Sequence, residues 1–167
     1  MRVLIAGVGN VLRGDDGFGV EVLHQLRREL GEPPDVRFFE SGIAGITLVQ
    51  QLLDSYDALI VLDALDRNAE PGTVFVLEPD VTALAARDRK NLGVDLHEAD
   101  PEGVFRIAAA LGVLPRRVWV VGCQAADCEE LGAGLSDAAR LAIPEVVRRV
   151  YDILATLRTA AGEPHAV

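Results

Sequence analysis

The chain has 167 residues, half of them hydrophobic, and carries 16 Lys and Arg against 26 Asp and Glu, a net charge of −10. This length is typical of one domain with a substantial core, and scattered basic residues in an acidic chain argue against nucleic acid as a partner. No apolar segment approaches the roughly 18 residues of a membrane span, and the chain starts on a core strand rather than a signal peptide, so we expect a cytoplasmic protein with no membrane partner.

Apolar runs and helical patterns alternate along the chain. Short runs, mostly rich in β-branched residues, predict five strands, at 2–7, 36–40, 58–63, 73–77 and 117–122. Apolar residues at three- and four-residue spacing predict helices at 18–30, 44–53, 101–111 and 135–157. This alternation favours βαβ units and hence a three-layer α/β/α fold with a central, mostly parallel five-stranded sheet.

Three segments depart from the regular alternation. Residues 64–72 are too few for a crossover helix, so one of the two strands that they join can run antiparallel at an edge. Residues 78–100 mix charges with a possible helical turn at 81–88 and are long enough for a functional loop. We expect residues 1–158 to form a single domain and residues 159–167 a flexible tail.

The glycine-rich loop after the first strand is the most informative segment. In MRVLIAGVGNVLRGDDGFGV, Gly7 and Gly9 permit turns closed to other residues, and the loop ends on Asp15 and Asp16 where a helix starts. The dinucleotide motif G-x-G-x-x-G begins correctly but has Leu12 in place of its third glycine. The pattern therefore favours a metal-site loop over a nucleotide loop.

Two carboxylates and one imidazole are the candidate metal ligands. Ligands of open α/β sheets bind beyond the carboxyl ends of the strands, where the winding direction reverses. If the strand order begins 2-1-3, Asp16 lies beside Asp63 at the end of the third strand, and His97 in the long connection can reach the same rim. Such a set suits a divalent transition metal with open coordination positions.

Each of these residues also has a purely structural interpretation. Helix capping accounts for one of Asp15 and Asp16. A turn explains Asp63 as well as ligation does. Spacing alone favours an ordinary histidine near a helix start for His97.

The chain offers no evident residue for covalent catalysis. Cys123 and Cys128, the only cysteines, fit neither a disulfide framework nor a standard zinc pair, so we expect free thiols. No serine lies in the nucleophile-elbow pattern G-x-S-x-G.

Six segments, in order over nearly the whole chain, together resemble the maturation endopeptidases of nickel-iron hydrogenases. They are GVGNVLRGDDGFGV (7–20), ESGIAG (40–45), LIVLDALD (59–66), PGTV (71–74), DLHEAD (95–100) and VVGCQ (120–124). The resemblance implies an aspartyl-type or metal-dependent hydrolase that removes a C-terminal extension from the hydrogenase large-subunit precursor after nickel insertion. It also implies that Asp16, Asp63 and His97 are the metal-binding and catalytic positions, and that the nickel is carried by the precursor rather than retained by the free enzyme.

The resemblance leads to a hypothesis about mechanism. Nickel held partly by the precursor's cysteines completes its coordination with Asp16, Asp63 and His97. The ion then activates the scissile carbonyl or a water, with Asp15 assisting the proton transfer, or it only positions the precursor.

Three further expectations concern surfaces and partners. Val11, Leu12 and Phe18 are candidates for apolar surface in the cleft that takes the precursor's tail, although burial in the core explains Phe18 equally well. We expect the protein to act as a monomer. Two other functions stay open. One is a nucleotide-binding Rossmann-like module without peptidase activity, in which Glu40 at the end of the second strand would bind a ribose. The other is another metal-dependent peptidase or amidohydrolase.

Overall fold

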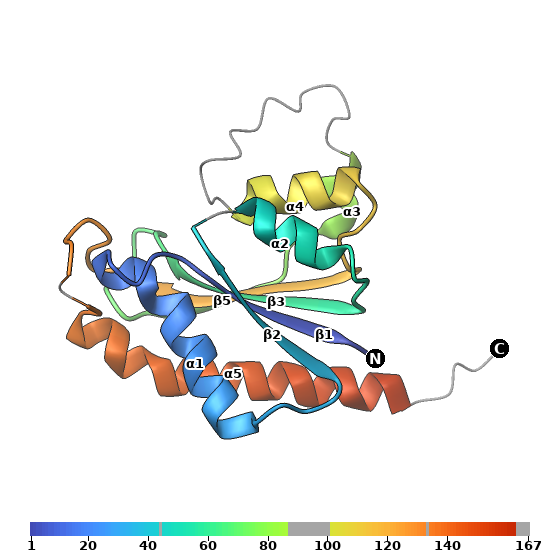
Figure 1. Ribbon diagram of the computed structural model, residues 1–167. Coiled ribbons are helices and arrows are strands. Elements are labelled where there is room, and N and C mark those ends of the chain that lie inside the picture. Colours follow the sequence, from blue (N-terminus) through green and yellow to red (C-terminus); the bar gives the residue numbers. More distant parts are fainter. Residues whose placement is uncertain (44, 87–100, 133, 163–167) are drawn as a thin grey trace.

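A five-stranded sheet in the order β2-β1-β3-β5-β4 forms the centre of the molecule (Figure 1). The computed structural model describes residues 1–43, 45–86, 101–132 and 134–162. Its strands are β1 (Val3–Val8), β2 (Val36–Gly42), β3 (Ala58–Leu65), β4 (Val74–Leu77) and β5 (Arg117–Gln124). All pairings are parallel except that of β4 with β5, so the predicted mostly parallel sheet is confirmed and β4 is its antiparallel edge strand.

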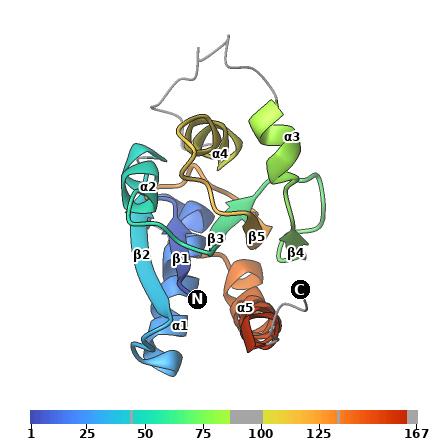
Figure 2. The ribbon, with the colours of Figure 1, turned by 90° about the vertical axis from the view of Figure 1, so that its right-hand side faces the viewer.

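Helices cover both faces of this sheet, which confirms the three-layer prediction (Figure 2). One face carries α1 (Phe18–Leu30) and α5 (Asp137–Gly162), and the other carries α2 (Gly45–Leu52), α3 (Val81–Ala86) and α4 (Pro101–Ala110). A short 3₁₀ helix, η1 (Gly14–Gly17), precedes α1. Among the described residues, no helix combines the length and the apolarity that a membrane crossing requires.

Alternate residues of the central strands fill two separate cores. In β1, Val3 and Ile5 pack with α1 and α5, whereas Leu4, Ala6 and Val8 pack with α2 and α4. A strand that is apolar on both sides is typical of a parallel sheet covered on both faces. The continuous apolar runs of the sequence are therefore the direct consequence of the three layers.

The last helix is longer than its sequence pattern predicts. α5 continues to Gly162, so residues 159–162 are helical rather than part of a tail. The side chain of Thr159 donates a hydrogen bond to the carbonyl of Ala155, 3.0 Å away, and the alanines that follow are strong helix formers. The prediction failed there because apolar periodicity stops at Leu157, the last buried residue of the helix.

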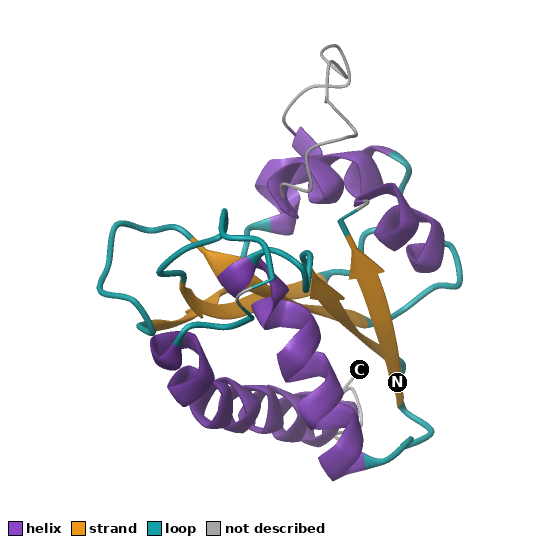
Figure 3. Ribbon diagram, turned by 60° about the vertical axis from the view of Figure 1, so that its left-hand side comes forward, coloured by secondary structure: helices purple, strands orange, loops and turns teal. Residues whose placement is uncertain are grey.

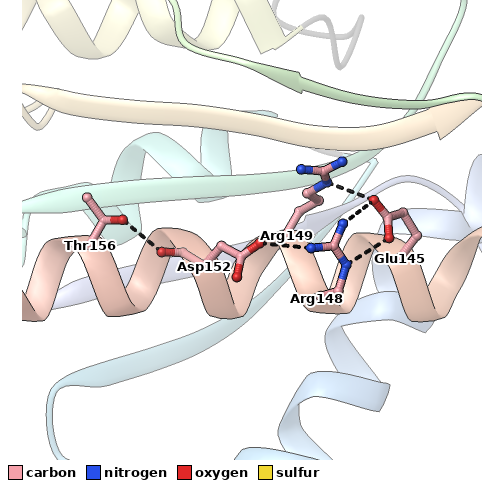
Figure 4. Close-up of polar contacts among 5 residues, drawn as sticks. All are labelled: Glu145, Arg148, Arg149, Asp152 and Thr156. Carbon is pink, nitrogen blue, oxygen red and sulfur yellow. Dashed lines mark hydrogen bonds and ion pairs between the residues drawn. The ribbon is translucent and has the colours of Figure 1, made fainter.

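The exposed face of α5 carries a ladder of ion pairs (Figure 4). Glu145 accepts hydrogen bonds from Arg148 and Arg149, and Arg148 also reaches Asp152. Thr156 donates to the backbone carbonyl of Asp152. Exposed pairs of this kind contribute little to stability, so the buried apolar face of the helix supplies most of its attachment to the sheet.

Candidate active site

The winding direction of the sheet reverses between β1 and β3, and the loop after β1 lies against the end of β3. β2 pairs with one edge of β1 and β3 with the other, as the predicted 2-1-3 order requires. At the start of α1, a Cβ added to Gly19 would lie 2.0 Å from the carbonyl oxygen of Leu62. This contact leaves no gap between the helix start and β3, and it brings η1 to the carboxyl rim of the sheet next to Asp63.

Asp16 is held at this rim by the backbone of its own loop. The amide of Asn10 donates to Oδ2 of Asp16 at 2.9 Å, and the amide of Asp16 donates to the carbonyl of Arg13 at 3.0 Å. Gly9 has a φ of +118°, and a Cβ there would lie 1.8 Å from the carbonyl oxygen of Asp16. The loop can therefore fold back on itself only with glycine at position 9, and this fold fixes the half-buried Asp16 side chain.

Asp63 lies within a strand rather than in a turn. β3 continues beyond it to Leu65, so the interpretation of Asp63 as a turn residue is wrong. In the register with β5, Asp63 pairs with Gly122, and a Cβ on that glycine would lie 1.9 Å from the carbonyl oxygen of Asp63. Only 7% of Asp63 is exposed, which makes it one of the buried acids among the described residues.

The charges of both acids affect the thiol of Cys128. Burial raises the pKa of Cys128 to about 11, and the negative charges of Asp16, Asp15 and Asp63 add to the rise. Effects of both acids on one thiol are consistent with the packing of the start of α1 against β3, which brings Asp16 and Asp63 to the same rim. Cys128 and the fully buried Cys123 are free thiols, in agreement with the prediction.

His97, the third predicted ligand, lies outside the described residues. Within the ranges that the structure describes, no group of three or more His, Cys, Asp or Glu side chains is arranged to hold a metal ion. The roles of Asp16, Asp63 and His97 in metal binding and catalysis therefore stay predictions.

Cys128 provides a chemical test of where the acid pair lies. At pH 8 a thiol with a pKa of about 11 is ionised roughly 100-fold less often than an exposed cysteine, so we expect slow alkylation by iodoacetamide. Asp16→Asn and Asp63→Asn each remove a negative charge, which lowers the pKa of Cys128 and should speed its alkylation. Mass spectrometry of the Cys128 peptide measures the rate, with the exposed Glu130→Gln as the control on the same loop. Rates unchanged in both acid variants would contradict the convergence.

Asp15 has a different part from the one expected. It is 1% exposed, and its carboxylate accepts hydrogen bonds from the amide of Ala126 at 2.7 Å and from the amide and hydroxyl of Ser136 at 2.7 and 2.9 Å. This carboxylate caps no residue of α1, since its partners lie on the loop that leads to α5, so the capping interpretation is wrong for Asp15. Its part in proton transfer stays a prediction.

The apolar surface near the rim is only partly as predicted. Val11 and Leu12 are 45% and 65% exposed, which agrees with a contact surface, whereas Phe18 is fully buried in the core. Leu131, 76% exposed, joins them because Arg13 forms an isolated β-bridge with it. No sequence signal indicates Leu131, since the bridge joins two separate loops.

A groove of about 450 Å³ opens on the α3–α4 side of the sheet. Its lining includes Leu65, two residues beyond Asp63 on β3, with Leu77, Ala83, Phe105 and Val120. The sequence did not predict this groove, because its walls come from the ends of β3 and β4, from β5 and from two helices.

Comparison with known proteins shows the family of this chain. A family model described as hydrogenase maturation protease matches residues 20–153. The chain belongs to the hydrogenase maturation protease family. It is thus a hydrolase that acts on a peptide bond, as the resemblance predicted.

Relatives and solved structures of this family match most of the chain. The hydrogenase expression/formation protein HupD of Rhizobium leguminosarum bv. viciae is 33% identical over 153 residues, which cover 92% of this chain and 74% of that protein. A hydrogenase 2 maturation peptidase from Thaumarchaeota archaeon SCGC_AB-539-E09 is 33% identical with a TM-score of 0.69, over 92% of this chain and 98% of that one. The maturating endopeptidase HybD of E. coli is 27% identical with a TM-score of 0.71, over 96% and 94%.

Membership in this family bears on the functions that the sequence left open. The matched proteins are hydrogenase maturation proteins, and they give no support to a nucleotide-binding module. The expectation that the hydrolase is of the aspartyl type is wrong in detail. Aspartic proteases use two carboxylates about 3 Å apart that share one proton, whereas Asp15, the neighbour of Asp16, is already bound by three donors of the scaffold.

Proposed function

We propose that this protein removes the C-terminal extension of a nickel-iron hydrogenase large-subunit precursor after nickel insertion, and that Asp16 and Asp63 recognise the nickel that the precursor carries. The observation that supports the proposal is the pair of acids, Asp16 in η1 and Asp63 in β3, that the packing of the start of α1 against β3 brings to the rim where the winding reverses. Two of the structural interpretations do not account for these acids, because Asp16 caps no helix with its side chain and Asp63 lies in a strand rather than in a turn.

The chemistry of the donors suits an ion that arrives with the substrate. Asp16 and Asp63 offer carboxylate oxygens, and His97 would add an imidazole nitrogen. Such a set lacks the soft thiolate ligands that hold late transition metals tightly, so the precursor's own cysteines would supply them. The purified protein should then contain little metal. Stoichiometric zinc that resists a chelator would favour a self-contained metallopeptidase instead.

The surroundings of the acid pair suit a protein substrate. Val11, Leu12 and Leu131 present exposed apolar side chains on the loops that flank Asp16. Exposed apolar surface beside a polar site is typical of a docking area for another protein. We propose that the precursor covers this surface while its tail is cut, that the protein works as a monomer, and that it acts in the cytoplasm.

The deciding experiment compares two forms of one substrate. The protein is incubated with the nickel-loaded precursor and with its metal-free counterpart, and the C-terminal mass of each is measured over time. Loss of the extension from the loaded form alone is the expected result. Equal cleavage of both forms, or cleavage of small peptides without nickel, would contradict the proposal and favour a different peptidase or amidohydrolase activity.

A further inference from the structure

Two loops far apart in the sequence are joined at the carboxyl rim of the sheet (Figure 3). One is the loop that contains η1, and the other is residues 125–136, between β5 and α5, which we call the β5–α5 loop. The amide of Gly132 donates to the carbonyl of Leu12 at 3.0 Å, and the amide of Asp15 donates to the carbonyl of Asp127 at 2.8 Å. Arg13 adds an ion pair with Glu129. The two loops therefore form one unit around Asp16.

Asp15 holds both ends of the β5–α5 loop at once. Its Oδ2 accepts from the amide of Ala126 and from the hydroxyl of Ser136, and its Oδ1 accepts from the amide of Ser136. All three distances lie between 2.7 and 2.9 Å, and the carboxylate is 1% exposed. A buried charge that accepts short hydrogen bonds from three donors is a strong and directional contact.

The same contact reaches the start of α5. The hydroxyl of Ser136 accepts a hydrogen bond from the amide of Ala139 at 3.2 Å while it donates to Asp15. Ser136 therefore caps α5 and binds Asp15 together. On the other side, a Cβ on Gly14 would lie 2.6 Å from the carbonyl oxygen of Asp127, so η1 packs against the loop without a gap.

We propose that Asp15 is a positioning residue, which locks the β5–α5 loop onto η1 and thereby sets the place of the adjacent Asp16 beside Asp63. The inference rests on the proposed function, because it assigns to Asp15 a part in nickel recognition through Asp16. Groups that orient a metal-binding side chain typically change metal affinity or activity by about 10- to 100-fold when they are altered.

The chemistry of the contact explains why position 15 requires an acid. Asp15→Asn replaces one accepting oxygen by an NH₂ group that would face an N–H donor. The amides of Ala126 and Ser136 cannot reverse their direction, so at least one hydrogen bond becomes a contact between two donors. The variant keeps the volume of the side chain and changes only this contact.

The test measures nickel selectivity, defined as the Kd for the metal-free precursor divided by the Kd for the nickel-loaded precursor. Binding is followed early in the reaction, and C-terminal mass confirms that the extension is still intact. We expect Asp15→Asn to lower the selectivity by about 10- to 100-fold. Ser136→Ala removes only the hydroxyl contact and should cause a smaller fall, which keeps the inference testable if the first variant does not fold.

Two controls separate positioning from loss of stability. Asp137→Asn makes the same chemical change at an exposed acid next to Ser136, and Val150→Ala weakens the core under α5. Both variants should keep the wild-type selectivity. Destabilisation lowers the folded fraction of the protease, and this weakens its apparent binding of both precursor forms by the same factor. If the folded Asp15→Asn and Ser136→Ala variants keep the selectivity of the wild-type protein, the inference about Asp15 is wrong and the proposed function still stands. If the wild-type protein itself has a selectivity near one, both the proposed function and the inference are wrong.

Discussion

Asp16→Asn and Asp63→Asn are each expected to lower kcat/KM for the nickel-loaded precursor by about 10²- to 10³-fold or more. Asparagine has nearly the same shape as aspartate but carries no charge, so the site loses the electrostatic attraction that a divalent ion requires. Asp16 keeps its backbone hydrogen bond to Arg13 in the variant, because the donor is its own amide. We therefore expect loss of processing without loss of the fold.

The control for this pair is a change of charge on the exposed face of α5. Glu145→Gln removes one negative charge from the ion-pair ladder (Figure 4) and should process the precursor at the wild-type rate. Thermal unfolding shows whether each variant is folded, and the C-terminal mass of the precursor shows whether it is active. Normal processing by both acid variants would remove Asp16 and Asp63 from the site.

The place of the acid pair was predictable because the signals for it are local. An apolar run predicts each central strand, and a general rule about open sheets then brings the ends of β1 and β3 together. Asp16 and Asp63 follow from these two steps without any knowledge of side-chain contacts. The edge position of β4 was predictable in the same way, since residues 64–72 cannot form a crossover helix.

The part played by Asp15 was not predictable, because its partners are distant in the sequence. Its hydrogen bonds join residues that are 111 and 121 positions apart, whereas the local signal, an acid before a helix, equally fits a cap. The exposed Leu131 and the groove beside Leu65 escaped prediction for the same reason. Contacts between separate loops leave no periodic pattern in the sequence, so properties that depend on such contacts cannot be predicted from it.

Gly9→Ala is expected to destabilise the protein by about 3 kcal/mol or more and to abolish processing. A Cβ at this position would meet the carbonyl oxygen of Asp16 at 1.8 Å, and the φ of +118° is a conformation that side chains rarely adopt. The obstructing atom belongs to the backbone, so relief requires η1 to move and carries Asp16 away from Asp63. Equilibrium unfolding in urea measures the first effect, and the processing assay below the unfolding temperature measures the second.

Gly31→Ala separates the clash from the backbone strain. Gly31, after α1, also has a positive φ, +67°, but no atom lies within 4 Å of an added Cβ. This variant should cost only about 1–2 kcal/mol and remain active. Equal effects of the two variants would contradict the argument. A large difference would mean that glycine is required at position 9 because the backbone of Asp16 packs against the end of β1. The Gly7-x-Gly9 pair, which resembles the start of a dinucleotide motif, would then position a carboxylate rather than bind a phosphate.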